Sequence, residues 1–277
     1  MGLSSVQERQ TTLSHGVTHY LEAGEGEPLI LLHGVGFWTG GDYWLANIVE
    51  LSRHFHVFSP DFVGWGNGDR LRVEYSFAYL VDFVREFQDT LGISSAHIVG
   101  HSMGGWVAAL LAYESPQRVR TLTLVGSGGM STRTLSTMTK FQPPTREDIL
   151  AHATKTLHAE LPIAELVDTW YRRTLLAGAV ESYQLILNHM NNSVHRARYH
   201  LGRRLQHIQC PTLVVWGAED QTNPVSLGQE MHALLPNSQM VVIPGGHDCA
   251  SENPEQFNQQ VIQFIRTHAR SSMEMDV

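Results

Sequence analysis

The chain has 277 residues, of which 42% are hydrophobic and 17% charged, a composition typical of a globular protein large enough to bury a substantial core. Its 27 acidic residues outnumber its 19 basic ones, and the net charge of −8 disfavours nucleic acid and anionic membranes as partners. No apolar run could cross a bilayer and the first residues form no apolar signal region, so we expect a cytoplasmic protein. The cysteines, Cys210 and Cys249, are expected to be free thiols.

Short apolar segments separated by turns predict a large sheet. Two strands at 8–14 and 18–23 come first. The later strands are almost entirely apolar, as expected for parallel strands covered on both faces; they span 29–32, 55–59, 97–99, 119–125, 210–215 and 239–243. Helices are predicted between them at 43–53, 77–91, 227–235 and 254–268. This alternation predicts an α/β fold with a mostly parallel sheet flanked by helices.

A glycine-rich loop, His33-Gly34-Val35-Gly36, directly follows the strand at 29–32. Such a loop allows backbone N–H groups to point into a site. The alternative is a plain strand-to-helix connection, and the pattern lacks the further residues of a phosphate-binding loop. We expect the N–H of Val35 to form one half of an oxyanion hole.

The segment Gly100-His101-Ser102-Met103-Gly104 joins the strand at 97–99 to a helix of small residues. In that context G-x-S-x-G predicts a sharp turn that presents a strained serine clear of the sheet. The flanking glycines are expected because strand and helix nearly touch there. The helix begins just after Ser102, so the N–H of Met103 is the expected second half of the oxyanion hole.

From residue 130 to 207 the pattern is helical, without a strand. Thr145 and Asp148 predict a helix start, and apolar residues recur at helical spacing over 163–176 and 180–190. A basic helical stretch follows over 195–205. We predict a helical cap over 130–207, inserted into a core formed by 1–129 and 208–277. The arginines at 195–205 are interpreted as a solvent-exposed face, with binding of an anionic substrate as the alternative.

Polar residues follow the last two predicted strands. A serine hydroxyl needs a base to accept its proton and an acid to orient that base. His247, after a strand and two glycines, is the candidate base, and Asp220 is the candidate acid, with Glu219 as its substitute. The order Ser102, Asp220, His247 is the one this strand–turn–helix motif requires. Because parallel strands end at one rim of the sheet, these residues are expected to meet there.

No pattern on the chain predicts a metal site, since neither H-E-x-x-H nor paired C-x-x-C occurs. We expect no metal and no cofactor. The expected partner is a small-molecule substrate rather than nucleic acid or a membrane, and a homodimer is compatible with the sequence.

Four motifs together resemble the α/β-hydrolase superfamily over essentially the whole chain. They are H-G-V-G at His33, G-H-S-M-G-G at Gly100, W-G-A-E-D at Trp216 and G-G-H at Gly245. The resemblance implies an eight-stranded sheet with a helical cap after the sixth strand. Serine at position 102 separates the chain from the dehalogenase and epoxide-hydrolase branches, which place aspartate there.

Within that superfamily the chain looks most similar to the meta-cleavage product hydrolases, which cut carbon–carbon bonds in 2-hydroxy-6-oxo-dienoates. The supporting stretches are P-D-F-V-G-W-G-N-G-D, S-M-G-G, P-P-T-R-E-D and E-L-V-D-T-W-Y. The family usually has asparagine at 101 and tryptophan at 248, where this chain has His101 and Asp248. Trp170 stands in place of the cap arginine that meets the substrate carboxylate. The substrate-binding residues expected on this basis are Gly34, Gly36, His101, Trp170, Arg172 and Arg173.

The sequence thus predicts a serine hydrolase that acts on a small apolar carbonyl compound, with a 2-hydroxy-6-oxo-dienoate as one candidate. The three departures leave a carboxylesterase or lactonase as the alternative. A further alternative is a non-catalytic ligand-binding protein on the same fold, because a fold alone does not determine function.

Overall fold

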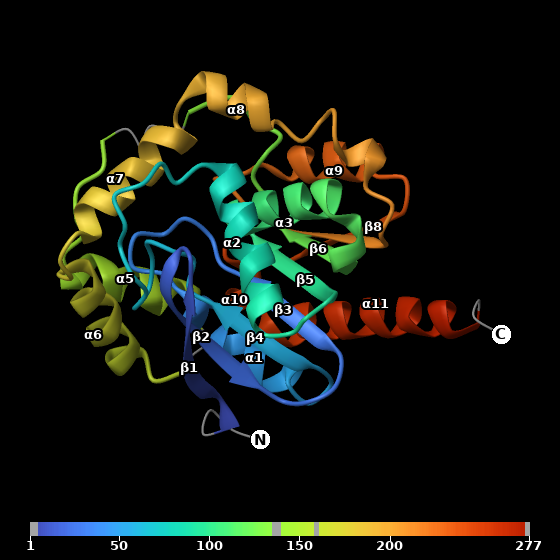
Figure 1. Cartoon of the computed structure of the whole chain (residues 1–277), viewed down its shortest axis with the longest axis horizontal. Coiled ribbons are helices and arrows are strands. Elements are labelled where there is room, and N and C mark those ends of the chain that lie inside the picture. The colour runs from blue at the N-terminus through green and yellow to red at the C-terminus, as the bar shows by residue number, and fades with distance from the viewer. Residues whose placement is uncertain (1–4, 135–139, 158–160, 275–277) are drawn as a thin grey trace.

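A computed structural model describes residues 5–134, 140–157 and 161–274 of the chain (Figure 1). Its centre is an eight-stranded sheet in the order β1-β2-β4-β3-β5-β6-β7-β8. The strands are β1 (Gln7–Leu13), β2 (Gly16–Ala23), β3 (Pro28–Leu32), β4 (His56–Pro60), β5 (Ala96–His101), β6 (Val119–Val125), β7 (Thr212–Gly217) and β8 (Ser238–Ile243). β2 pairs antiparallel with β1 and β4, and the other strands pair in parallel. This confirms the predicted fold class.

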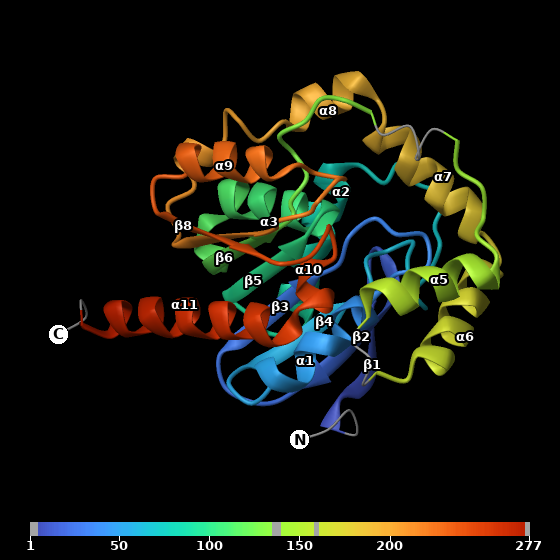
Figure 2. The same ribbon diagram turned by 180° about the vertical axis from the view of Figure 1, so that it is seen from behind.

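Helices cover both faces of the sheet, as the two views in Figures 1 and 2 show. One layer contains α2 (Phe77–Thr90), α3 (Met103–Glu114) and α9 (Val225–Leu234), and the other α1 (Leu45–Leu51), α10 (Cys249–Glu252) and α11 (Pro254–Glu274). Along β3, Ile30 and Leu32 pack into the first layer while Leu29 and Leu31 pack into the second. Alternation across the pleat therefore explains why this strand is apolar throughout.

The described residues between β6 and β7 contain helices and no strand. The α-helices are α5 (Arg146–Thr156), α6 (Ile163–Thr174), α7 (Ala179–Met190) and α8 (Ser193–Tyr199). α5 begins as expected, because Thr145 and Asp148 form a reciprocal capping box. These helices lie beside the carboxyl-terminal edge of the sheet in both views (Figures 1 and 2). No helix of the described residues is both long and apolar enough to cross a membrane.

The helices differ from the sequence-based prediction in several places. A 3₁₀ turn (Gly41–Trp44) precedes α1, and the short helix α10 was not predicted. α8 ends at Tyr199 instead of continuing to 205. Its last carbonyl accepts a bond from the Trp106 indole at 2.8 Å, and the Leu201 N–H bonds Gly129 at 2.8 Å. These contacts with the core turn the chain away from the helix axis, which helical spacing cannot reveal.

Strand β5 and helix α3 approach so closely that side chains are excluded between them. A Cβ atom at Gly100 would lie 2.4 Å from the Gly104 carbonyl oxygen, and one at Gly104 would lie 2.4 Å from the Leu32 carbonyl oxygen. Both obstacles are backbone atoms, which cannot rotate aside. The glycines of the motif are therefore steric requirements of the strand–helix crossing.

Gly104→Ala is expected to lower the free energy of unfolding by about 1–3 kcal/mol, because α3 must move off the sheet to accept the methyl group. Urea denaturation of the wild type and the variant measures this difference. Gly246→Ala is the control, since its Cβ would find its nearest neighbour at 3.4 Å. Equal losses in both variants would contradict the steric argument.

Candidate active site

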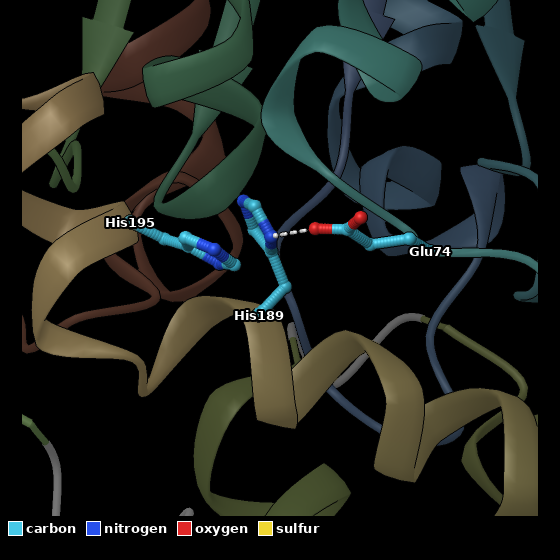
Figure 3. Close-up of side chains that lie close together, drawn as sticks. All are labelled: Glu74, His189 and His195. Carbon is cyan, nitrogen blue, oxygen red and sulfur yellow. Dashed lines mark hydrogen bonds and ion pairs between the residues drawn. The ribbon is translucent and has the colours of Figure 1, made fainter.

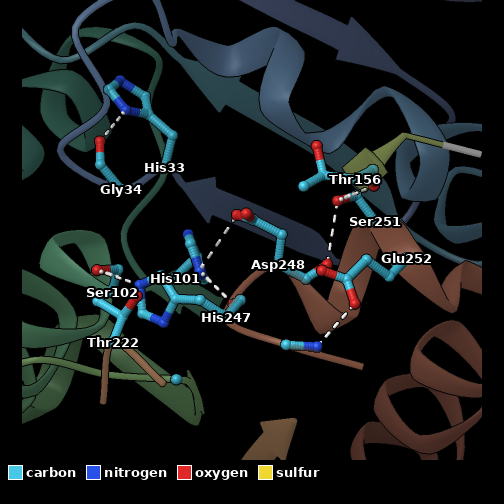
Figure 4. A network of polar contacts seen from close by, with 12 residues as sticks. His33, Gly34, His101, Ser102, Thr156, Thr222, His247, Asp248, Ser251 and Glu252 are labelled. Carbon is cyan, nitrogen blue, oxygen red and sulfur yellow. Dashed lines mark hydrogen bonds and ion pairs between the residues drawn. The ribbon is translucent and has the colours of Figure 1, made fainter. Parts of the chain in front are cut away.

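Ser102, His247 and Asp220 form a continuous hydrogen-bonded chain at the carboxyl-terminal rim of the sheet. The Ser102 hydroxyl donates to His247 Nε2 at 2.9 Å, and His247 Nδ1 donates to Asp220 Oδ2 at 2.8 Å. Figure 4 shows the contact between Ser102 and His247. Residues that lie 145 and 27 positions apart in sequence are thus brought together, as the sequence motifs predict.

Ser102 occupies the sharp turn between β5 and α3. Its φ of 53° makes it the only non-glycine residue with positive φ among the residues that the structure describes. Its N–H donates to the Val125 carbonyl at 2.9 Å, and its own carbonyl accepts from Gly128 at 2.9 Å. The neighbouring strand end therefore stabilises a backbone conformation that is costly for serine.

Asp220 is held by its own loop. Its side chain is fully buried, and Oδ1 accepts the backbone N–H groups of Thr222 and Asn223 at 2.9 Å each. The remaining oxygen is directed to His247 Nδ1, which leaves Nε2 as the acceptor for the serine proton. Glu219, the predicted substitute, instead accepts the Gly245 N–H at 2.6 Å and stabilises the turn before His247.

A cavity of about 1010 Å³ opens beside Ser102. Gly34, Val35, Gly36 and Met103 line it, as predicted from the loop after β3 and the start of α3. Met103 is the first residue of α3, so its N–H has no partner within the helix. The placement of Val35 and Met103 on the same cavity as Ser102 is the arrangement that an oxyanion hole needs.

His101 contacts several parts of the site at once. Its Nε2–H donates to the His247 carbonyl at 2.9 Å (Figure 4). Its ring stacks on Tyr43 with centroids 4.6 Å apart. Its Nδ1 packs against Gly34, where a Cβ atom would lie 3.0 Å away. Burial, and then the nearby His247, lowers the pKa of His101 to about 4. The imidazole is therefore neutral at neutral pH, and its hydrogen bond joins the turn at Ser102 to the backbone of His247.

Three predicted substrate-binding residues lie away from the cavity. The Trp170 indole donates to Asp42 Oδ2 at 2.9 Å, and the Arg173 guanidinium forms a buried ion pair with Asp42 at 2.8 Å. Arg172 is bonded to Asp168 and Thr169 on its own helix. Trp170 and Arg173 thus anchor α6 to the core, and we do not retain these three residues in the binding site.

Other residues of the cap line the cavity instead, and they include one arginine of 195–205, for which binding of an anionic substrate was the alternative interpretation. From α5 these are His152, Lys155 and Thr156, and from α7 and α8 they are Met190 and Arg196. Arg196 is only 6% exposed, which corrects the prediction of a solvated face for this arginine. Arg198 and Arg203 are exposed as predicted, whereas Arg204 is buried, contrary to the prediction.

The Arg196 guanidinium is fixed by two backbone carbonyls, and one of its nitrogens has no hydrogen-bond partner in the described structure. Its guanidinium donates to the carbonyls of Met190 and Ser131 at 3.0 and 2.8 Å and lies over the Trp106 ring. Its Nε is buried without a hydrogen-bond partner in the described structure. A guanidinium on the cavity wall is suited to an anionic group of a ligand.

Glu74, His189 and His195 form the one cluster of potential metal ligands found among the described residues (Figure 3). His189 Nδ1 donates to Glu74 at 3.2 Å, while its Nε2 accepts the Phe77 N–H at 3.3 Å. A neutral histidine that binds a metal through Nδ1 must carry its proton on Nε2. The Phe77 N–H already points at that atom, so we assign His189 a structural role between α7 and the start of α2.

Three buried histidines make stability depend on pH. Burial lowers the pKa of His33, His97 and His101 from 6.5 to about 4. Between these values the unfolded chain binds protons that the folded chain excludes, so stability should fall as the pH drops from 6.5 to 4. In His101→Gln the slope of the free energy of unfolding against pH should decrease by up to about 1.4 kcal/mol per pH unit. Urea unfolding across this range measures both slopes, and an unchanged slope in the variant would contradict the assignment.

The bond from His101 to the His247 carbonyl predicts a positioning role. His101→Leu should lower kcat by about tenfold or more with little change in KM, since misplacing a base by a fraction of an ångström is costly. His101→Gln retains an N–H donor of similar reach and should recover most of the loss. Steady-state kinetics on an ester substrate measures both; equal losses in the two variants would rule out this role.

A family model for the alpha/beta hydrolase fold matches residues 27–254. The 2-hydroxy-6-oxo-6-phenylhexa-2,4-dienoate hydrolase of Burkholderia cepacia is 29% identical over 270 residues, which cover 91% of this chain and 92% of that protein. A 2-hydroxy-6-oxononadienedioate/2-hydroxy-6-oxononatrienedioate hydrolase of Paraburkholderia phymatum is 32% identical, with coverages of 89% and 90%.

Solved structures agree with these relatives. The meta-cleavage product hydrolase of Pseudomonas fluorescens IP01 superimposes with a TM-score of 0.82 at 26% identity, covering 95% of this chain and 99% of that one. A bacterial membrane phospholipase A gives a TM-score of 0.80 at 25% identity, with coverages of 96% and 88%. The match of the family model over most of the chain shows that this protein belongs to the alpha/beta hydrolase family of enzymes.

Proposed function

We propose that the protein is a serine hydrolase in which Ser102 is the nucleophile, His247 the base and Asp220 the orienting acid. The observation that carries the proposal is the unbroken path of hydrogen bonds from the Ser102 hydroxyl through both nitrogens of His247 to Asp220. A metal is not needed for this chemistry, because the imidazole supplies the base and backbone N–H groups supply the charge stabilisation.

In the proposed reaction His247 Nε2 accepts the Ser102 proton as Oγ attacks the substrate carbonyl carbon. The N–H groups of Val35 and Met103 stabilise the negative oxygen that forms. His247 then donates the proton to the leaving group, and an acyl group remains on Ser102. Water deprotonated by His247 releases the acid and regenerates the hydroxyl.

A 2-hydroxy-6-oxo-dienoate is the first candidate substrate. The support comes from the names of the relatives from Burkholderia and Paraburkholderia, which are 29% and 32% identical over most of the chain. Such a compound carries a carboxylate, and Arg196 offers the cavity a buried guanidinium in place of the missing arginine at position 170. Carbon–carbon cleavage also requires ketonisation of the dienol, for which His247 is the available proton carrier.

A carboxylic ester or lactone is the second candidate. The carboxylate of Asp248 lies on the cavity wall, directly after the base, and repels a substrate carboxylate at that end. The same triad cleaves esters without a ketonisation step. The position of Asp248 therefore favours an ester over a dienoate if the substrate carboxylate must bind beside His247.

Ser102→Ala should abolish turnover of short-chain nitrophenyl esters while leaving the unfolding midpoint near that of the wild type. Removing a triad member typically costs several orders of magnitude in kcat. Ser127→Ala is the matched control, since Ser127 follows a neighbouring strand and bonds only the Gly128 carbonyl. Turnover that survives in Ser102→Ala would overturn the mechanism.

Parallel turnover of a 2-hydroxy-6-oxo-dienoate distinguishes the two substrate classes. Preference for the dienoate, with a higher KM in Arg196→Gln, supports carbon–carbon cleavage. Preference for the ester supports the second candidate. Absence of turnover of either, with retained ligand binding, would favour a non-catalytic binding protein.

A further inference from the structure

Residues 125–128, at the end of β6, lie beside all three members of the proposed triad. Two of these residues hold the turn at Ser102 through backbone hydrogen bonds of 2.9 Å each. Gly126 lies beside the other two members: a Cβ atom on it would be 3.2 Å from Asp220 Oδ2 and 3.3 Å from His247 Nδ1. These are the two atoms that share the acid–base hydrogen bond. The end of β6 is therefore a common support for the triad.

The side chain of Asn223 joins the loop of the acid to this support. Its Nδ2 donates to the Gly126 carbonyl at 2.8 Å, and this is the one hydrogen bond between residues 218–224 and residues 125–128 in the part of the chain that the structure describes. A carbonyl oxygen can only accept, so the atom that faces it must be the nitrogen of the carboxamide. The contact thus requires a donor at position 223.

The backbone of Asn223 is bonded to the acid and to β7. Its N–H donates to Asp220 Oδ1 at 2.9 Å, and its carbonyl accepts the Trp216 indole N–H at 2.7 Å. Trp216 is a fully buried residue of β7. These bonds tie the acid to the strand that precedes it, whereas the carboxamide ties it to β6, the strand that holds Ser102.

A shift of this loop relative to β6 would change the acid–base hydrogen bond. The Asp220 side chain is fully buried, and one of its oxygens is bonded to N–H groups of its own loop, so the carboxylate moves with the loop. Its other oxygen points at His247 Nδ1 only while the loop keeps its place beside Gly126. A misplacement of about 1 Å in a catalytic group can lower a rate by about two orders of magnitude.

We propose that Asn223 is a positioning residue for the triad: its bond to the Gly126 carbonyl sets the place of Asp220 relative to His247 and Ser102. Asn223 borders the cavity, but its nitrogen is committed to Gly126, so it acts through the acid and not on the substrate. The inference rests on the proposed function, in which Ser102 is the nucleophile and Asp220 orients the base.

Two substitutions remove the donor. Asn223→Leu keeps the size of the side chain, and Asn223→Ser has a hydroxyl that ends one bond short of the position of Nδ2; the serine variant decides the question if leucine does not fit. Gln229→Leu is the matched control, because it removes a carboxamide from an exposed position of α9 outside the cavity. A urea midpoint for each variant shows that it is folded.

Two kinetic measurements report on the triad. One is the turnover of a short-chain nitrophenyl ester, and the other is the rate of inactivation by a fluorophosphonate, which phosphonylates an activated serine with loss of fluoride. Both Asn223 variants should lower kcat and the inactivation rate constant by about tenfold or more while KM changes by less than about twofold, since the base is misplaced and the cavity is kept. Gln229→Leu should leave all three quantities unchanged.

Proton NMR gives a readout that does not depend on turnover. The proton between His247 Nδ1 and the Asp220 carboxylate takes part in a charge-assisted hydrogen bond, so its resonance is expected far downfield. Loss of this resonance in Asp220→Ala assigns it. Asn223→Leu should move it upfield or broaden it, whereas Gln229→Leu should leave it in place.

A folded Asn223 variant with unchanged kcat and an unchanged downfield resonance would overturn the positioning role. A loss confined to KM would overturn it too, because it would indicate a contact with the substrate. If the fluorophosphonate labels Ser102 in the wild type and reacts equally fast with the Asn223 variants, the inference fails and the serine mechanism stands. If the wild type is not labelled and Ser102→Ala remains active, the serine mechanism fails and the inference fails with it.

Discussion

The close crossing of α3 over β3 and β5 is the constraint on which the site depends. Only backbone atoms fit where Gly100 and Gly104 meet, at a hypothetical Cβ distance of 2.4 Å. That contact forces Ser102 into a positive φ and directs its hydroxyl out of the sheet. It also brings the first N–H groups of α3 to the cavity. The proposed nucleophile and the proposed oxyanion hole are therefore two consequences of one steric arrangement.

The sequence predicts those parts of the molecule that follow from local physics. Apolar strands, glycines at a forced turn and a capping box each have their cause within a few residues, and the mostly parallel sheet follows from the alternation of strands and helices. The triad was predictable for a related reason. Parallel strands end at one edge, so Ser102, Asp220 and His247 had to meet there in any fold of this class.

Contacts of the cap were not predictable in the same way. Arg173 and Arg196 both lie on helices with exposed arginines nearby, and spacing alone does not distinguish them. Arg173 is buried because Asp42, 131 residues earlier, faces it, whereas Arg196 is buried over Trp106. Packing between distant segments decides that Arg173 anchors the cap and that Arg196 lines the cavity. The sequence contains no local signal for this difference.

His101 shows why the site contains two adjacent imidazoles but one base. The rings of His101 and His247 lie 4.7 Å apart, so a charge on His101 would disfavour the imidazolium that His247 would form in the proposed mechanism. Burial prevents that charge, and stacking on Tyr43 together with the bond to the His247 carbonyl fixes the neutral ring. With asparagine the position would offer a donor without a titrating ring. Histidine retains the N–H donor and adds an aromatic ring that stacks on Tyr43. Because this ring can also be protonated, the surrounding packing must keep it in the neutral form.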